Sequence, residues 1–178
     1  DAPASTAAAA SASQPSATAG TAFEGISADP VDLGELTSPR ASLAHHFEAV
    51  REGRWDDATR HLVCDAKQHA RSADLAQRFK AVIDDTGSID LETVSDSHQG
   101  KQDDGLPAKL EEIARITLDG RTEPLRMVRR SDDEGTHWAF SAATVSRFDA
   151  WYGRLPDRRL RDAMVASGLD VMLLPGPF

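Results

Sequence analysis

Three stretches in the first half of the chain place apolar residues at the three- and four-residue spacing of an amphipathic helix. The first opens with Ser38 and Pro39, an N-cap residue followed by proline at the first helical position, and Gly53 predicts its end. The second follows at once, so the two predict a helical hairpin. The third begins near Ser72 and stops at Gly87. Their apolar positions are Leu43, Ala44, Phe47 and Val50; Trp55, Ala58 and Leu62; and Leu75, Ala76, Phe79, Val82 and Ile83.

The pattern then changes to the two-residue period of a β-strand. Alternation over 89–94 predicts a first strand, and the polar residues 95–107 predict a loop. The strongest turn signal is Asp119-Gly120, between the runs 113–118 and 122–130, because Asp-Gly suits the positive φ angles of a tight hairpin turn. Pro124 should mark the start or an edge of the second strand, since proline has no N–H to donate.

The last third of the chain returns to helices after one more strand. Residues 131–136 predict a turn and 137–140 a short aromatic strand. Ser141 predicts the cap of a helix, and after Pro156 a short basic helix follows. The residues expected to face inward from the helix after Ser141 are Val145, Phe148, Trp151, Tyr152 and Leu155.

These elements predict an α+β protein, with N-terminal helices packed on a small antiparallel sheet and C-terminal helices that lead toward a membrane span. Residues 1–37 are rich in Ala, Ser, Thr and Pro and contain no Lys or Arg. Such a composition buries too little apolar area to offset chain entropy, so we expect a disordered tail. The predicted organisation is the tail 1–37, an α+β domain over 38–155, and a membrane-proximal helical connector over 156–178.

Composition narrows the function classes. The net charge of −9 argues against nucleic acid as a partner, because phosphate binding needs clustered Lys and Arg. No stretch approaches the roughly 18 apolar residues that span a bilayer. A single cysteine excludes an intrachain disulfide framework.

Histidines and the cysteine supply one candidate metal site. His61, Cys64 and His69 offer a thiolate and two imidazoles, ligands that suit zinc, but their spacing fits no standard zinc motif. Adjacent His45 and His46 diverge by about 100° on a helix and cannot chelate together, so one of them is expected to face water. The alternative for the first three residues is one half-buried thiol and two surface imidazoles.

Two clusters of acidic residues are further candidates for an ion-binding site. Asp103-Asp104 and Asp132-Asp133-Glu134 are each followed by glycine, a combination typical of turns, and neither has the alternating ligands of a calcium loop. The sequence has no Gly-rich phosphate loop, no Gly-x-Ser-x-Gly and no His-Glu-x-x-His. The sequence does not exclude a Ser/His/Asp catalytic triad whose members come together only in the folded protein. The sequence therefore nominates no catalytic, cofactor-binding or metal-binding residue.

Aromatic residues and arginines adjoin each other near the C-terminal end. Such a pair can lie at a membrane–water boundary. We interpret Trp151 as a core residue and expect Arg158, Arg159 and Arg161 at the interface.

Six segments form an ordered set: 38–41, 53–58, 75–84, 89–91, 103–107 and 138–145. In this order and spacing they resemble the N-terminal extracytoplasmic domain of some bacterial small-conductance mechanosensitive channel (MscS-like) proteins. Two departures are Ser88, where the family has a tryptophan, and a more basic 95–103 loop. The resemblance covers about 38–178, which is most of the chain.

The resemblance implies a non-enzymatic domain on the periplasmic side of the bacterial inner membrane, without a cofactor. It implies membrane spans after Phe178 and a homo-oligomer in the full-length protein. The expected roles are assembly, contact with another envelope protein, or modulation of gating. Two alternatives stay open: a small-ligand-binding or enzymatic module with the cone-shaped fold of nuclear transport factor-like domains, and a free-standing secreted adaptor.

Overall fold

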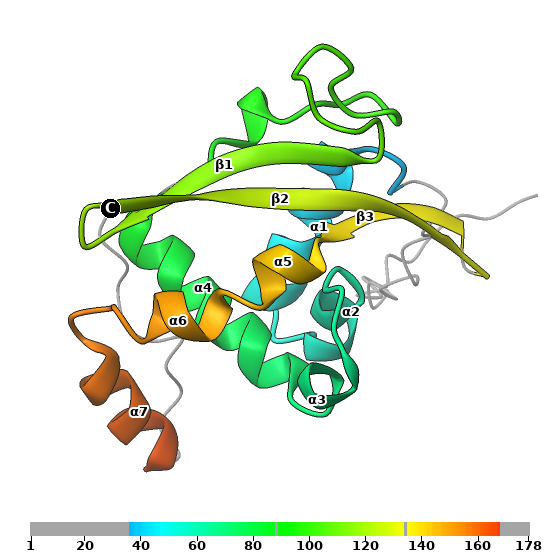
Figure 1. The fold of residues 1–178 in the computed structure, drawn as a ribbon. Coiled ribbons are helices and arrows are strands. Elements are labelled where there is room, and N and C mark those ends of the chain that lie inside the picture. Colours follow the sequence, from blue (N-terminus) through cyan, green and yellow to red (C-terminus); the bar gives the residue numbers. More distant parts are fainter. Residues whose placement is uncertain (1–35, 88, 134, 168–178) are drawn as a thin grey trace, which may run out of the picture. The chain divides into compact units, whose positions relative to one another are not determined.

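The fold joins a helical N-terminal half to a three-stranded antiparallel sheet and three short C-terminal helices (Figure 1). A computed structural model describes residues 36–87, 89–133 and 135–167. The predicted α+β class is confirmed. The helices are α1 (Pro39–Arg51), α2 (Trp55–Arg60), α3 (Ala66–His69), α4 (Ser72–Thr86), α5 (Ala142–Val145), α6 (Phe148–Tyr152) and α7 (Arg158–Ala166), with a 3-10 turn η2 (Leu91–Thr93); the strands are β1 (Leu110–Leu118), β2 (Arg121–Asp132) and β3 (Gly135–Phe140).

The sheet is built on the predicted hairpin. Asp119 and Gly120 have φ angles of 49° and 71°, which join β1 to β2 through a tight turn. The strand order is β1-β2-β3, so β2 lies in the middle. Pro124 pairs with Arg115 of β1, while the pairing of β2 with β3 starts only at Met127. Proline therefore occupies a part of β2 that has a neighbour on one side only, in agreement with the edge prediction.

Both long helices have the predicted boundaries. The Ser38 hydroxyl accepts a hydrogen bond from the Ala41 N–H and caps α1, with Pro39 at the first helical position. Helix α4 begins at Ser72 and ends at Thr86, and Gly87, which follows it, adopts the left-handed conformation. The predicted apolar stripe of α4 packs inward, and Leu75, Ala76, Phe79 and Val82 are buried.

The core gathers where α1, α4 and α6 meet the sheet. Phe79 of α4 stacks on Phe148 of α6 with ring centroids 4.2 Å apart and lies edge-on to Phe140 of β3 at 4.8 Å. Met127 pairs with Phe140 and is fully buried, as is Trp151. Aromatic side chains thus fill the space between the helices and the sheet, where a cone-shaped fold would hold its ligand.

The outer edge of β3 is covered rather than open. The Phe140 N–H donates to the His61 carbonyl and the Val63 N–H donates to the Phe140 carbonyl, so residues 61–63 run beside the strand. The Trp138 N–H donates to the Ser42 hydroxyl of α1, which itself donates to the Leu36 carbonyl. This cover removes an edge that would otherwise pair with another chain.

Three local expectations differ from the structure. Residues 89–94 do not form a strand: the Asp90 carboxylate accepts the Glu92 N–H and turns this segment into η2. Helix α3 was not expected from the sequence. A capping box between Asp65 and Gln68 stabilises its N-terminus. The helix after Ser141 is divided into α5 and α6, although all five residues predicted to face inward are buried.

The structure describes only parts of the predicted tail, 1–37, and of the predicted connector, 156–178. Leu36 is buried and the Thr37 carbonyl accepts the Trp138 indole N–H, so order begins no later than Leu36. The rest of the predicted tail, 1–35, lies outside the described residues, as do 168–178 of the connector. Within the described ranges, no helix is both long and apolar enough to cross a bilayer.

Candidate functional site

Four of the six histidines meet at the junction of α1, the end of α2 and β3. His45 and His46 lie on α1, His61 follows α2, and His137 lies on β3, and all four are buried. The ring centroid of His61 lies 5.1 Å from that of His45, 6.0 Å from His46 and 6.2 Å from His137. We call these four residues the imidazole cluster. The expectation that His45 or His46 faces water is wrong, because both side chains are buried.

Hydrogen bonds fix which ring nitrogens carry protons. A carbonyl only accepts, so His61 Nδ1 donates to the Trp138 carbonyl at 3.1 Å and His46 Nδ1 donates to the Ala58 carbonyl at 3.0 Å. The other nitrogen of neutral His61, Nε2, is then an acceptor, and His45 Nδ1–H donates a hydrogen bond to it at an N···N distance of 2.9 Å. His45 is thus oriented by a chain of bonds that ends on the β3 backbone.

Burial favours the neutral form of these rings. It lowers the pKa of His46 to about 4 and the pKa of His61 to about 3, while the bonds to carbonyls oppose the change. The pKa of His45 is also lowered, first by burial and then by the charge of Arg54. His137 Nδ1 has no hydrogen bond among the described residues and lies 3.6 Å from a carboxylate oxygen of Asp132.

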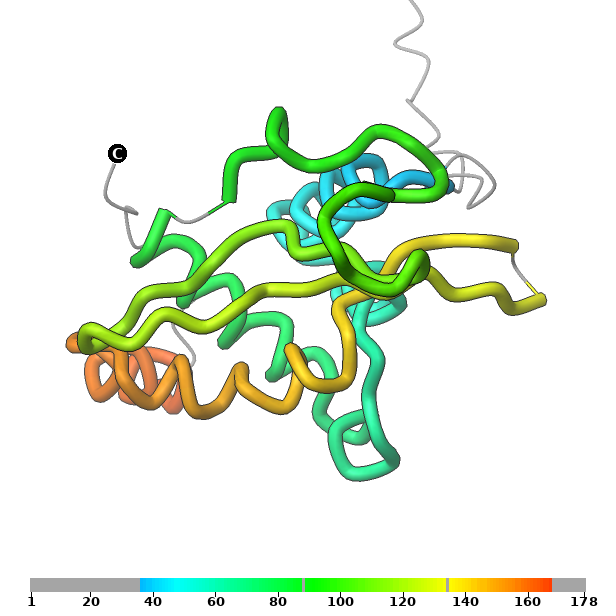
Figure 2. Tube along the Cα trace, turned by 45° about the horizontal axis from the view of Figure 1, so that its top comes forward, coloured from blue at the N-terminus to red at the C-terminus, as the bar shows by residue number. Residues whose placement is uncertain are grey.

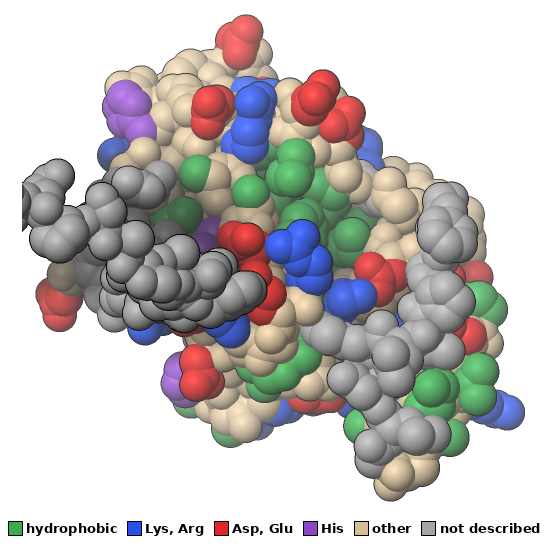
Figure 3. Space-filling view, turned by 180° about the vertical axis from the view of Figure 1, so that it is seen from behind, with side chains coloured by type: hydrophobic (Ala, Val, Ile, Leu, Met, Phe, Trp, Pro, Cys, Tyr) green, Lys and Arg blue, Asp and Glu red, His purple; other side chains and the backbone are tan. Residues whose placement is uncertain are grey.

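An open groove of about 530 Å³ runs along the outer side of α1, next to the cluster. His45 forms part of its wall, and Glu48 and Arg51 supply its charged groups. The other side chains that line the groove are apolar. The groove lies on the side of the molecule that faces the viewer in Figure 3. The apolar lining residues are Leu36, Ala41, Ala44, Phe47 and Leu91.

The three residues weighed as a candidate zinc site are not brought together. His61 is fully buried in the imidazole cluster, Cys64 is half-buried, and His69 is exposed at the end of α3. Among the residues that the structure describes, no group of three His, Cys, Asp or Glu side chains is placed to hold a metal ion. Burial raises the pKa of the Cys64 thiol, which favours its protonated form.

The described residues of the two acidic clusters, at 103–104 and 132–134, lie at turns. Asp104 accepts the Leu106 N–H in the exposed 95–107 loop, and Asp132 ends β2. Glu134 lies outside the described residues. A different carboxylate, Glu111, is fully buried and was missed by the sequence analysis: its two oxygens accept the backbone N–H groups of Ser95 and Lys101 at 3.0 Å each. It fixes the loop, whose approach to the start of α1 can be followed in Figure 2.

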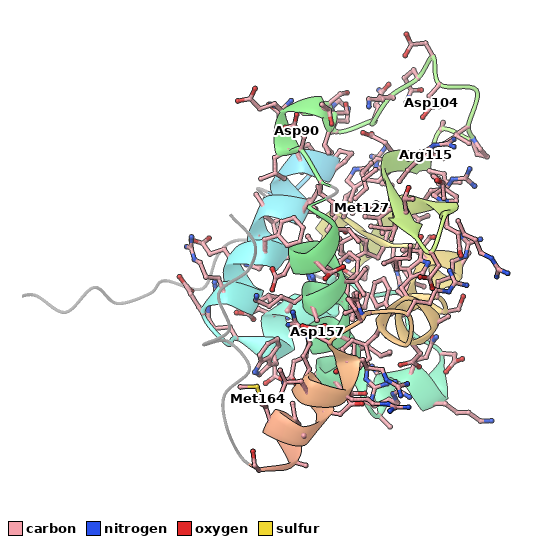
Figure 4. All side chains as sticks on the ribbon, turned by 90° about the vertical axis from the view of Figure 1, so that its left-hand side faces the viewer. Asp90, Asp104, Arg115, Met127, Asp157 and Met164 are labelled. Carbon is pink, nitrogen blue, oxygen red and sulfur yellow. The ribbon has the colours of Figure 1, made fainter. Side chains whose placement is uncertain are left out.

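Helix α7 carries the exposed apolar side chains of the C-terminal region. Leu160 and Val165 are 58% and 56% exposed. Arg159 is exposed nearby, whereas Arg161 is buried and pairs with Asp157 at 2.6 Å, so the expected interfacial position of Arg161 is wrong. Figure 4 labels Met164 on this helix and Asp157, the residue that precedes it.

One signal in the sequence points to the imidazole cluster. His46 stands three residues after Leu43 and four before Val50, which is a position of the apolar stripe. His61 and His137 carry no such signal, because only the pairing of 61–63 with β3 brings them to α1.

The fold defines the chain as an α+β protein with a filled core, a covered sheet edge and a buried imidazole cluster. Comparison with known proteins adds no relative: no family model, no curated protein and no solved structure matches the chain.

Proposed function

We propose that the chain is a non-enzymatic extracytoplasmic domain of an MscS-like membrane protein, placed on the periplasmic side of the inner membrane, where it modulates gating or assembly. The observation that carries the proposal is α7, on which the exposed Leu160 follows the exposed Arg159 and Val165 is also exposed. In the sequence, this helix is followed by Leu169, Asp170 and then the four apolar residues 171–174. Apolar side chains next to Arg suit the boundary between water and lipid.

The rest of the domain supports a mechanical rather than a chemical role. The space between helices and sheet is filled by Phe79, Phe140 and Phe148. Helix α7 is joined to α6 by a hydrogen bond from the Tyr152 hydroxyl to Asp162, and its Arg161 side chain is buried. A displacement of α7 would therefore reach α6 and the core through these side chains.

The first experiment determines the reading frame downstream of Phe178. Apolar segments of about 20 residues there are the expected result. A stop codon directly after Phe178 would contradict the proposal and favour the free-standing adaptor.

The second experiment tests the role of α7 in the full-length protein. Leu160→Gln with Val165→Gln is expected to shift the tension threshold in patch-clamp recordings, or the subunit stoichiometry, because both side chains leave the boundary region. Arg121→Gln with Thr122→Gln, both exposed on the hairpin, is the matched control and should leave gating unchanged. An unchanged tension response and stoichiometry, also after removal of 38–155, would overturn a modulatory role.

One observation favours a second candidate, a ligand-binding module. The groove along α1 combines an apolar floor with His45, Glu48 and Arg51, as small-molecule sites do. Ala44→Trp should then abolish binding of an amphiphilic probe dye, while Ala163→Trp on α7 should not. Equal binding by both variants would count against the groove.

A further inference from the structure

We propose that the imidazole cluster makes the attachment of the α1–α2 hairpin to β3 dependent on pH, so that acid releases residues 61–63 from the β3 edge before the β1–β2 hairpin unfolds. This inference does not depend on the proposed function.

The attachment depends on His61 more than on any other residue of the segment. The backbone carbonyl of His61 accepts the Phe140 N–H at 2.7 Å, and its ring donates to the Trp138 carbonyl at 3.1 Å. Only Val63 adds another backbone bond, donating to the Phe140 carbonyl at 3.0 Å. Both the main chain and the side chain of one histidine therefore join this segment to the sheet.

A proton on His61 disrupts this arrangement. Its Nε2 is the acceptor for His45 Nδ1–H, and a protonated Nε2 would place two N–H groups face to face across 2.9 Å. His45 can avoid this contact by moving its own proton to Nε2. The charge then remains buried beside three other imidazoles, and burial of an ion without a counter-ion strongly favours opening to water.

The charged groups around the cluster do not compensate for this charge. Those that act on His61 and His46 are other imidazoles alone. Carboxylates and guanidinium groups act instead on the two outer rings of the cluster. Around His45 these are Glu48 of α1, Arg54 before α2, and Asp57 and Arg60 of α2; beside His137 it is Asp132 of β2.

The direction of the pH effect follows from the neutral folded state. The folded pKa values, about 4 for His46 and about 3 for His61, lie below the ordinary value of 6.5 that each ring regains when exposed. The open form therefore binds more protons than the closed form. Attachment is fully present above pH 6.5 and is lost as pH falls toward 4.

Native-state amide hydrogen exchange measures the release directly. The reporters are the Val63 and Phe140 amides, whose acceptors belong to this attachment, and the Arg129 amide of β2, which donates to the Lys109 carbonyl. After correction for intrinsic exchange, the opening constant at Val63 and Phe140 should rise by up to about tenfold per pH unit for each histidine between pH 6.5 and 4. Arg129 should stay protected over the upper part of this range. Loss of protection at all three amides together would overturn the proposal.

Asparagine variants separate the cluster from general acid effects. His46→Asn with His61→Asn keeps a donor near the Nδ1 position but cannot take up a proton, so the pH dependence at Phe140 should flatten. His69→Asn with His98→Asn, both exposed, is the matched control and should keep the wild-type profile. The proposal is wrong if the control flattens the profile equally, or if wild-type protection does not change with pH. Should the cluster variant not fold, wild-type exchange decides, together with the titration of the His61 ring resonances by NMR.

Discussion

Gly100 is the residue whose replacement should reveal the packing beneath the 95–107 loop. It has a φ of 70°, and a Cβ there would lie 2.8 Å from both a Glu111 oxygen and the Trp138 ring. Gly100→Ala should reduce the free energy of unfolding by about 3 kcal/mol, from backbone strain plus overpacking. Gly105 has a φ of 73°, but a Cβ there would have no atom within 4 Å. Gly105→Ala should therefore reduce the free energy of unfolding by only about 1 kcal/mol. Urea denaturation compares the two, and equal losses would contradict the contact.

The buried carboxylate of Glu111 leads to a second prediction at the same scale. Glu111→Gln replaces one acceptor oxygen by an NH2 group, which cannot accept the N–H of Ser95 or Lys101. The loss should be about 2 kcal/mol, with faster amide exchange at one of these two residues. Glu112→Gln, which alters a surface ion pair with Arg126, should lose less than about 1 kcal/mol. A larger effect at Glu112 would show that Glu111 does not hold the loop.

Local chemistry explains which elements could be predicted from the sequence. Ser38-Pro39 and Asp119-Gly120 determine their backbone conformations through their own side chains, and the structure has a cap and a turn there. The alternation of apolar residues over 89–94 wrongly predicted a strand. The Asp90 carboxylate instead accepts a hydrogen bond from the backbone N–H of Glu92, which favours a turn. The imidazole cluster could not be predicted, apart from His46, since it depends on a pairing between residues 77 apart.

Helix α7 is attached to the rest of the domain by a few side chains, which makes its release testable. Tyr152→Phe removes the hydroxyl that donates to Asp162, a bond worth about 1 kcal/mol. Trypsin cleavage at Arg158 and Arg159 should become roughly fivefold faster, while the free energy of global unfolding changes little. Ser146→Ala, which removes a hydroxyl bond within the exposed turn after α5, is the control. Unchanged cleavage would mean that the Tyr152–Asp162 bond does not hold the helix.

For the whole molecule, groups at opposite ends of the core limit stability on both sides of neutral pH. On the acid side, His46 and His61 are neutral when folded and have pKa values of about 4 and about 3, so stability falls as pH drops below 6.5. On the alkaline side, burial and then the bond to Asp162 raise the pKa of Tyr152 to about 12. Its contribution is present below pH 10 and is lost as pH rises toward 12.

The free energy of unfolding, measured by urea titration from pH 4 to pH 11, should therefore form a plateau between about pH 6.5 and pH 10. The acid limb should be the steeper, because two buried histidines contribute on the order of 3 kcal/mol each, a large part of the 5–15 kcal/mol typical of a domain. His46→Asn with His61→Asn should flatten the acid limb alone, and Tyr152→Phe the alkaline limb alone. If either variant changed both limbs, the two groups would be coupled through the Phe79–Phe140–Phe148 core rather than acting as independent proton sites.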